Sequence, residues 1–505
     1  MQSQDIKPRK PQDENIVENV ELNIWEALIP VFALVAMLFY NVFYAYGDDA
    51  LSGSNQFILL LGAAVAAIVG AFNKVGYKQM LEEVAENVKS TTSALLILLM
   101  VGALAGTWLI SGIIPTMIHY GLQILNPTIF LASCVVICAI ISIATGSSWT
   151  TSATVGIALV GIAEALGISL GMTAGAVLSG AYFGDKLSPL SDTTNLAPAM
   201  AGTDLFTHIK YMTYTTVPTI IVTLIVFIFI GLGLEPEGVA DTASILTSID
   251  ASFNISPWLF VVPLLVIVMI IKKTPPLIAL LVGTLLGAVA ALIFQPDIVQ
   301  TLGGGDSLNF TTAYKGIMDA ITVDTAVATD NEALNDLFSA GGMSGMLGTI
   351  WLIVCAMVFG GIMDAIGALS RISKALLSLF HTTFGLFAST VTSCLALNLT
   401  ASDQYLAIVV PGKMYSKAFK DKGLAPENLS RTLEDSGTVT SVLIPWNTCG
   451  AYQSGVLGVP VVDYFAFAIF NWLSPFMTLI FAAFKIKIRM LTQPNKVETE
   501  IVSGE

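Results

Sequence analysis

The sequence predicts an all-α protein that crosses a membrane many times, built as two inverted-topology repeats with broken or re-entrant helices. Three observations predict this fold class. The 505 residues are 55% apolar and only 11% charged, whereas soluble proteins carry about 25% charged residues. Long apolar runs recur along the whole chain. Polar breaks interrupt these runs in corresponding places of the two halves.

Apolar runs are the first element of the prediction. A hydrocarbon core about 30 Å thick needs about 20 apolar residues per helix. Backbone groups find no water at that depth, so the runs are expected to be helices. Together with broken segments they predict about 10 to 14 membrane passes. The runs cover residues 29–40, 57–72, 94–118, 129–144, 217–232, 258–271, 276–294, 347–366 and 465–484.

The distribution of Lys and Arg predicts the orientation. Basic residues cluster in short loops and near both ends, and acidic stretches poor in Lys and Arg separate them. Because cytoplasmic loops are enriched in basic residues, both termini are expected in the cytoplasm. The predicted parts are a cytoplasmic N-terminal tail 1–23, a first transmembrane repeat 24–234, an external linker 235–256, a second transmembrane repeat 257–489 and a cytoplasmic C-terminal tail 490–505. Each half then crosses an odd number of times, and the two halves have opposite orientations.

Net charge and cysteine usage exclude some partners. The formal net charge is −14, which does not suggest a nucleic-acid partner. The five cysteines lie in or beside apolar segments without a metal-ligand spacing, so we interpret them as small core residues.

A weak internal repeat supports two related halves. At a shift of 255 positions, Gly106 falls on Gly361 and Gly112 on Gly367. At the same shift, two hydroxyl residues of the first half fall on hydroxyl residues of the second. The matches fall on helix-breaking and polar positions, where a repeat is constrained. Inverted repeats of this kind place a binding site near the membrane midplane, between broken helices.

The polar breaks are the chemically informative elements. Seven of the thirteen residues in 144–156 are Ser or Thr, and the corresponding break is 398–412. A second pair of breaks covers 184–202 and 434–458. Polar backbone survives at membrane depth only when protein buries it or when it lines a wet cavity. The alternative is that these hydroxyls only bond their own helix backbone or a neighbour. The candidate ligands are Thr145, Ser147, Ser148, Thr400 and Ser402.

Acidic residues in the breaks are the strongest candidates. A carboxylate at the bilayer centre costs roughly 2.5 to 3.5 kcal/mol on insertion scales, so it usually has a function. We rank Asp185 and Asp403 first. Asp403 lies in a Ser/Thr break and has no adjacent basic residue. The further candidates are Asp192, Glu434 and Asp435.

Each carboxylate also has a structural alternative. Asp185 precedes Lys186 and is able to form a local ion pair with it. Asp192 is placed to cap the half-helix that follows it. One of the adjacent acids at 434 and 435 is placed to neutralise Arg431.

Two asparagines are neutral ligand candidates. Asn195 and Asn447 each lie at the end of a break and precede small residues. An amide oxygen is a good ligand for a hard cation, although the same side chain also caps helices.

The segment FGDKLSPLSDTTNLA, at 183–197, closely resembles the hallmark segment of the NhaC family of bacterial Na+/H+ antiporters. The stretch LEDSGTVTSVLIPWNTCGAY, at 433–452, is similar to the same family, and the resemblance runs from about residue 25 to residue 489. The resemblance implies a secondary carrier with paired re-entrant hairpins, often dimeric. The matching residues are Asp185, Ser188, Asp192, Thr193, Thr194 and Asn195, then Glu434, Asp435, Thr438, Trp446 and Asn447.

The expected function is exchange of Na+ for H+ across the bacterial cytoplasmic membrane. No enzyme motif appears in a suitable context, and neither catalysis nor a cofactor is expected. Burial disfavours the charged form of a carboxylate, so one group holds either a proton or a sodium ion. The expected partners are membrane lipid, the two transported cations and a second copy of the chain. The candidate Na+ ligands are Asp185, Asn195, Ser147, Asp403 and Asn447.

The sequence is also compatible with other functions. Some members of the family resemble exchangers of malate and lactate coupled to Na+ and H+. Such a carrier needs a cation in its site, and Arg431 is the arginine placed near a break. A channel or a membrane-bound sensor is the rival from another functional class.

Overall fold

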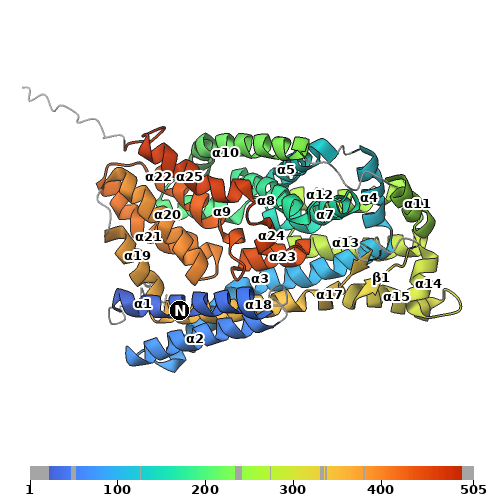
Figure 1. Ribbon diagram of the computed structural model, residues 1–505, viewed down its shortest axis with the longest axis horizontal. Helices are drawn as coiled ribbons and strands as arrows, with labels where there is room; N and C mark the ends of the chain where they lie inside the picture. Colours follow the sequence, from blue (N-terminus) through green and yellow to red (C-terminus); the bar gives the residue numbers. More distant parts are fainter. Residues whose placement is uncertain are drawn as a thin grey trace, which may run out of the picture.

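The protein is almost entirely helical in a computed structural model (Figure 1). The structure describes residues 22–46, 53–124, 127–233, 242–272, 274–329, 335, 338–378 and 382–491. Most of the two predicted tails, and the first part of the predicted 235–256 linker, lie outside the described residues.

The first half of the chain holds the broken helices expected there. Its elements are α1 (Ile24–Tyr40), η1 (Asn41–Tyr46), α2 (Ser54–Phe72), α3 (Tyr77–Ile110), α4 (Ile113–Ile124), α5 (Pro127–Thr145), α6 (Ser148–Thr151), η3 (Ser152–Gly156), α7 (Ile157–Ala165), α8 (Leu170–Leu187), α9 (Asp192–Ala201) and α10 (Leu205–Gly233).

The second half follows after α11 (Thr242–Ser252). Its helices are η5 (Pro257–Phe260), α12 (Val261–Ile271), α13 (Pro276–Phe294), α14 (Pro296–Gly303), α15 (Phe310–Thr322), α17 (Gly342–Gly345), α18 (Leu347–Ala365), α19 (Ala368–Ser378), α20 (Thr383–Thr400), α21 (Gln404–Asp421), α22 (Pro426–Leu433), η6 (Glu434–Thr438), η7 (Ser441–Leu443), α23 (Thr448–Leu457), α24 (Val461–Tyr464) and α25 (Ile469–Ala483). A two-stranded antiparallel ribbon joins β1 (Thr325–Ala326) to β2 (Ser339–Ala340), with Thr325 opposite Ala340.

Long apolar helices confirm a multi-pass membrane protein. Within the described residues, eight helices are long and apolar enough to cross a membrane. The segments 245–252 and 257–271 together form a ninth candidate, bent by 86° at the break between them. These eight or nine spans are fewer than the predicted passes, because the prediction also counted broken helices, which are too short to qualify as spans here.

The internal repeat is visible in the helix boundaries. At the same shift of 255 positions, α18 ends where α3 ends and α20 ends where α5 ends. The paired glycines have matching backbone conformations: Gly112 has φ +79° and Gly367 has φ +75°, each just after a helix end. Glycine adopts this left-handed conformation without the penalty of a Cβ atom, which explains why glycine ends both helices. The predicted fold class is thereby confirmed.

The two halves interlock through their short helices. In Figure 1, α5, α7 and α8 lie to one side of the molecule and α19 to α22 to the other. The short helix α9 of the first half packs on α21 and α22, and α23 of the second half packs on η3 and α7. The ends of both broken segments therefore meet in the middle of the protein.

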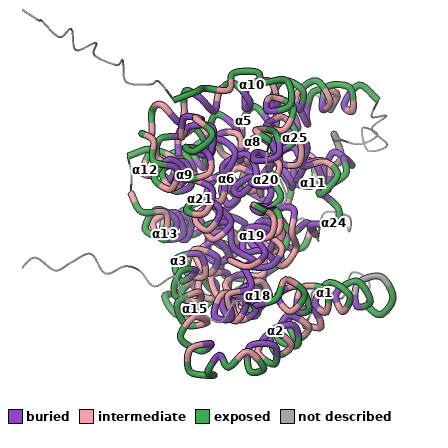
Figure 2. The backbone as a smooth tube through the Cα atoms, turned by 90° about the vertical axis from the view of Figure 1, so that its left-hand side faces the viewer, coloured by how far each residue is buried: buried purple, intermediate pink, exposed green. Residues whose placement is uncertain are grey.

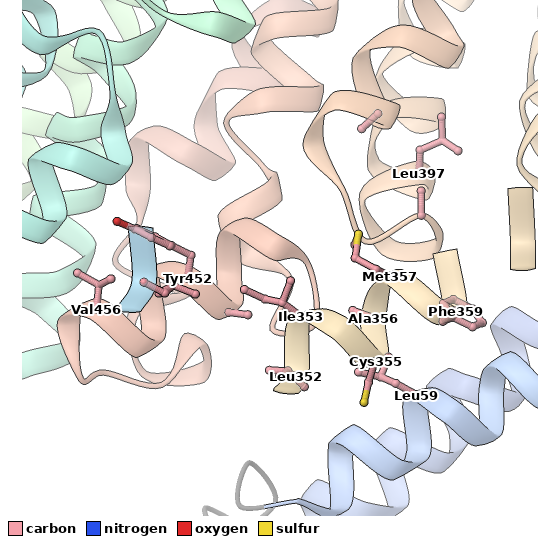
Figure 3. Packing of buried hydrophobic residues seen from close by; sticks show 14 of the residues in the cluster. Leu59, Leu352, Ile353, Cys355, Ala356, Met357, Phe359, Leu397, Tyr452 and Val456 are labelled. Atoms are coloured by element: carbon pink, nitrogen blue, oxygen red, sulfur yellow. The ribbon is translucent and has the colours of Figure 1, made fainter. Parts of the chain in front are cut away.

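An apolar core holds this arrangement together. Figure 3 shows part of it, where Ile353, Met357 and Phe359 of α18 pack with Leu59 of α2 and Leu397 of α20. The outer faces of α1, α2 and α10 are exposed, while the interior is buried (Figure 2). These outer faces carry large apolar side chains, as expected for surfaces that contact lipid. The predicted core cysteines are all buried and unpaired: Cys134, Cys138, Cys355, Cys394 and Cys449.

Candidate functional site

The broken segments of both halves border one cavity of about 440 Å³. Of the described residues that line it, three are acidic and none is basic: Asp185, Asp192 and Asp403. Hydroxyl side chains form much of the remaining wall, including Thr145, Ser147, Thr150, Ser191, Thr193 and Thr448. Five of the candidates from the sequence are therefore brought together at one place.

Asp185 is buried at the end of α8 and is held by the start of α6. Its Oδ2 accepts hydrogen bonds from the backbone N–H of Ser148, at 3.1 Å, and from the Ser148 hydroxyl, at 2.6 Å. Ser148 is the first residue of α6, so its N–H has no partner within the helix and is free for the carboxylate. A helix N-terminus also favours negative charge beside it. The break in the first half thus positions Asp185.

The break before α6 depends on Gly146. Its φ is +72°, and a Cβ atom there would lie 2.5 Å from the Cβ of Leu190. The next residue, Ser147, caps α6: its Oγ accepts a hydrogen bond from the N–H of Thr150 at 3.2 Å. The hydroxyl of Thr145 lies 3.5 Å from that of Thr151. Thr145 and Ser147 therefore contribute hydroxyl oxygens to the cavity wall at the point where the helix is interrupted.

Asp403 is the counterpart in the second half. It is 4% exposed, and its Oδ1 accepts a hydrogen bond from the N–H of Leu406 at 3.0 Å as the N-cap of α21. The preceding Ser402 has φ +58°. The carboxylate therefore both caps a half-helix and lines the cavity.

The hydroxyl candidates of the second half do not line the cavity. Thr400 donates its hydroxyl hydrogen to the carbonyl of Ala396 in its own helix, at 2.8 Å. The backbone oxygen of Ser402 accepts from the N–H of Thr448 at 2.9 Å, which ties the break to α23. Thr448 lines the cavity instead.

Asp192 is not a helix cap, contrary to the alternative considered from sequence. Ser191 caps α9 by accepting from the N–H of Thr194 at 3.3 Å, and Asp192 is exposed at the cavity wall. Asn195 is also exposed but lies outside the lining. Its amide donates to the carbonyls of Pro189, at 3.0 Å, and Ser191, at 2.7 Å, and so holds the turn before α9.

Asn447 holds the other break together. It is buried, and its amide donates to the backbone oxygen of Asn398 at 3.1 Å. Its Oδ1 accepts from the N–H of Cys449 at 3.0 Å, as the N-cap of α23. The structure gives Asn447 the capping role that the sequence left open, and it does not line the cavity.

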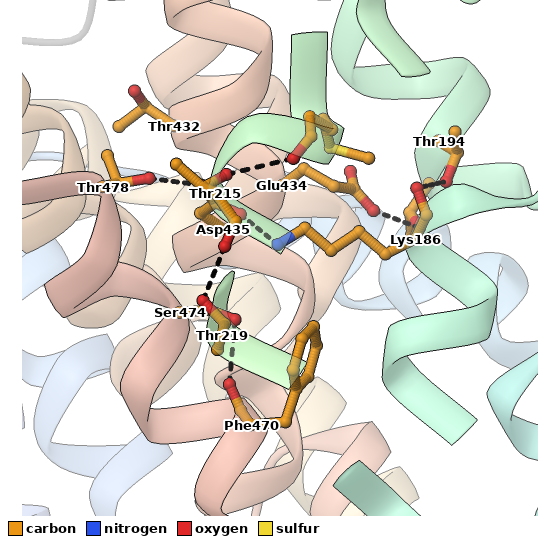
Figure 4. A network of polar contacts seen from close by, with 12 residues as sticks. Lys186, Thr194, Thr215, Thr219, Thr432, Glu434, Asp435, Phe470, Ser474 and Thr478 are labelled. Atoms are coloured by element: carbon orange, nitrogen blue, oxygen red, sulfur yellow. Dashed lines mark hydrogen bonds and ion pairs between the residues drawn. The ribbon is translucent and has the colours of Figure 1, made fainter. Parts of the chain in front are cut away.

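Glu434 and Asp435 lie behind the cavity in a buried polar network (Figure 4). Asp435 forms an ion pair with Lys186 and accepts hydrogen bonds from Thr215, at 2.9 Å, and from Thr478. The predicted local pair of Asp185 with Lys186 is wrong, because the lysine turns toward the second half of the chain. Consecutive side chains on an α-helix point in directions about 100° apart, so Asp185 and Lys186 face different surroundings.

The other acid of this network bonds to the first half. Oε1 of Glu434 accepts a hydrogen bond from the Thr193 hydroxyl at 2.9 Å. The buried Oε2 has no partner within the described part of the chain.

Arg431 is buried and forms no direct ion pair with an acidic side chain among the described residues. None of its side-chain nitrogens forms a hydrogen bond there. Its guanidinium carbon lies 4.5 Å from the ring centre of Tyr211 and 5.8 Å from that of Phe481. No direct ion pair joins Arg431 to either adjacent acid, although the charge of Asp435 still acts on it, and Arg431 does not line the cavity.

Some residues of the site were missed from sequence. The cavity also includes Ser90, Thr91 and Ser93 of α3. Their signal was present as the run STTS, which stands where the charged first part of α3 passes into its apolar part. Lys186 and Thr215 carried no signal for their pairing with Asp435, because their partner is more than 200 residues away.

The donor set suits a hard cation. Carboxylate, hydroxyl and carbonyl oxygens are the ligands that hard cations prefer. Within the described residues, no three His, Cys, Asp or Glu side chains converge closely enough to hold a resident metal ion. The cavity wall itself offers carboxylate and hydroxyl oxygens, which are ligand types that hard cations bind.

Comparisons with known proteins agree over most of the chain. The family model described as the Na+/H+ antiporter family matches residues 180–486. The chain is 38% identical over 423 residues to the Na(+)/H(+) antiporter NhaC of Alkalihalophilus pseudofirmus, covering 84% of this chain and 88% of that protein. It is 34% identical over 406 residues to the NhaC antiporter of Bacillus subtilis, covering 80% and 86%.

A third relative is named for a different activity. The chain is 34% identical over 448 residues to the malate-2H(+)/Na(+)-lactate antiporter of Bacillus subtilis, covering 88% of this chain and 92% of that protein. The family match spans more than half of the chain, and each of these relatives exceeds 30% identity over most of its length. The multi-pass chain with its acidic cavity therefore belongs to the Na+/H+ antiporter family.

Proposed function

We propose that the protein exchanges Na+ for H+ across the bacterial cytoplasmic membrane, with both termini in the cytoplasm. The observation that carries this proposal is the cavity wall, whose described charged residues are all acidic. Such a wall attracts a cation and repels an anion. The family and its NhaC relatives support the same activity.

Sodium binding is proposed at Asp185 and Asp403, one carboxylate from each half. The Ser147 and Thr145 hydroxyl groups lie on the same wall and supply neutral oxygens. A proton on either carboxylate removes the charge that holds the metal ion. The two cations therefore compete, and each is carried in place of the other without any covalent step.

Alternating access is proposed to come from movement of one repeat against the other. The cavity wall contains the breaks of both halves, so such a movement changes its opening. At its edge, the rings of Trp149 and Tyr452 stack with centres 3.9 Å apart, and these residues belong to different halves. Movement of one repeat against the other must either preserve this stack or break it.

Exchange of small organic acids is the alternative, supported by the malate–lactate relative. A carboxylate substrate needs a basic side chain in its site. Lys186 and Arg431 are both fully buried and outside the cavity lining. The arrangement therefore favours a cation as the principal substrate.

The test is reconstitution in liposomes that contain a pH-sensitive dye. An inward sodium gradient should drive protons outward, and Asp185→Asn and Asp403→Asn should each abolish this movement. Asp306→Asn, an exposed acid outside the cavity, is the matched control and should exchange normally. Normal exchange by both cavity variants would show that the site is elsewhere. Sodium flux without opposite proton flux would indicate a channel, and dependence on malate would indicate the alternative exchanger.

The oligomeric state is part of the proposal. The resemblance to the family implies a homodimer, which light scattering of the purified protein measures directly.

A further inference from the structure

A second pocket, of about 460 Å³, lies at the start of α10 and is separate from the cavity. Its basic side chains are Lys210, Lys487 and Arg489, and its aromatic side chains are Tyr211 and Tyr214. The first turns of α10 form one wall, and the segment that follows α25 forms the other. We call this set of residues the basic pocket.

The basic pocket carries a positive excess. The ammonium of Lys487 lies 5.0 Å from the ring centre of Tyr214, and Lys210 is exposed. Arg489 is paired with Glu427 at 2.6 Å. The other acid near this end of α10 is Asp204, which accepts a hydrogen bond from the N–H of Thr207 at 3.0 Å. Two lysines therefore remain without an acidic partner among the described residues.

The wall after α25 is held in a fixed shape. The backbone oxygen of Arg489 accepts from the N–H of Ala425 at 2.9 Å, and the N–H of Leu491 donates to Gly423 at 2.7 Å. The hydroxyl of Tyr211 donates to Oδ1 of Asn428 at 2.6 Å. A basic group on a fixed backbone loses less freedom when it binds an anion.

An apolar surface continues from the basic pocket along α10. Val217 and Ile221 are 41% and 50% exposed, and Phe229 further along is 69% exposed. Figure 2 shows this outer face of α10 at the surface of the molecule. A ligand that fits both features has an anionic head and an apolar tail.

We propose that the basic pocket binds the phosphate headgroup of an anionic phospholipid at the predicted cytoplasmic surface. Lys210 and Lys487 hold the phosphate, and the acyl chains lie along the outer face of α10. Free inorganic phosphate shares the head chemistry but makes no use of the apolar surface. The proposal is independent of which cations the carrier exchanges.

The probe is short-chain phosphatidylglycerol added to detergent-purified protein, with phosphatidylcholine and inorganic phosphate in parallel. We expect phosphatidylglycerol alone to raise the melting temperature and to appear as bound lipid in native mass spectrometry. Each basic residue near an anionic surface contributes about 1 kcal/mol, so Lys210→Gln/Lys487→Gln should bind phosphatidylglycerol roughly 20- to 30-fold more weakly.

Two further variants control this experiment. Lys417→Gln/Lys420→Gln removes the same charge from exposed positions of α21 outside the basic pocket and should bind normally. Lys210→Arg/Lys487→Arg keeps the charge and should retain binding. Equal loss in the α21 variant, unchanged binding by the glutamine variant of the basic pocket, or an equal effect of inorganic phosphate would overturn the proposal. None of these readouts depends on transport, so they stand apart from the test of the proposed exchange.

Discussion

Asp185 and Lys186 are consecutive in the last turn of α8 but belong to different surroundings. Asp185 lines the cavity and is bonded to Ser148, whereas Lys186 forms a buried ion pair with Asp435 (Figure 4). The carboxylate that we propose as a sodium ligand is thus joined directly to an ion pair between the two halves. A shift of this turn on cation binding would also move Lys186 and so alter the contact between the repeats.

Ser148→Ala tests how the cavity carboxylate is positioned. The substitution removes the hydroxyl that donates to Asp185 at 2.6 Å and leaves the backbone donor in place. A hydrogen bond to a charged group contributes about 1.5 kcal/mol or more, which corresponds to a factor of roughly ten. We expect the half-saturating sodium concentration in the liposome assay to rise roughly tenfold.

Ser133→Ala is the matched control for this prediction. Its hydroxyl bonds to the carbonyl of Ile129 on an exposed face of α5, outside the cavity. It should transport with unchanged sodium dependence. An unchanged sodium dependence in Ser148→Ala as well would mean that this hydroxyl does not support the site.

The ion pair of Lys186 with Asp435 should be required for folding as a pair. Breaking a buried pair by removing one partner costs about 3–5 kcal/mol, because the remaining charge has no counter-ion. Lys186→Met and Asp435→Leu should each lower the melting temperature of the purified protein strongly. The double variant Lys186→Met/Asp435→Leu should recover most of the loss, since neither member of the pair is left without its counter-ion. Additive losses in the double variant would contradict this account of the pair.

The sequence allowed the broken helices and much of the cavity wall to be predicted. Polar residues at membrane depth are rare, so Asp185, Asp403, Asp192, Thr145 and Ser147 stood out against their apolar surroundings. All five line one cavity. The physical basis is that a polar group in the bilayer must face protein or water, whichever element carries it.

The remaining details depend on which faces of distant helices meet. Asn195 and Asn447 have the right chemistry for ligands, yet both amides bond to nearby backbone and lie outside the lining. Lys186 joins Asp435 across 249 positions of sequence. These hydrogen-bond and ion-pair partners follow from tertiary packing, which the pattern of polar residues along the sequence does not determine.

The close contact of α3 with α15 predicts an effect of Gly106→Ala. A Cβ atom at Gly106 would lie 1.8 Å from the backbone oxygen of Ala320, so the two helices must separate. Forced expansion of a packed contact costs about 1–3 kcal/mol. We expect a lower melting temperature, while Gly345→Ala should be tolerated because nothing lies within 4 Å of its added Cβ. An equal melting temperature for both variants would show that the α3–α15 contact adjusts freely.

Competition between the two cations predicts a definite pH dependence. A protonated carboxylate carries no charge, so acidification must weaken sodium binding, and alkalinisation must strengthen it until the carboxylates are fully ionised. In the acidic range, the half-saturating sodium concentration should rise about tenfold per pH unit if one proton competes and about a hundredfold if two compete. The slope measured in liposomes therefore counts the protons displaced by each sodium ion. Any residual transport by Asp403→Asn should show a smaller slope if Asp403 is one of the competing groups. A sodium dependence that does not change with pH would separate the proton route from the cavity and would require another carboxylate, such as the buried Glu434, to carry the proton.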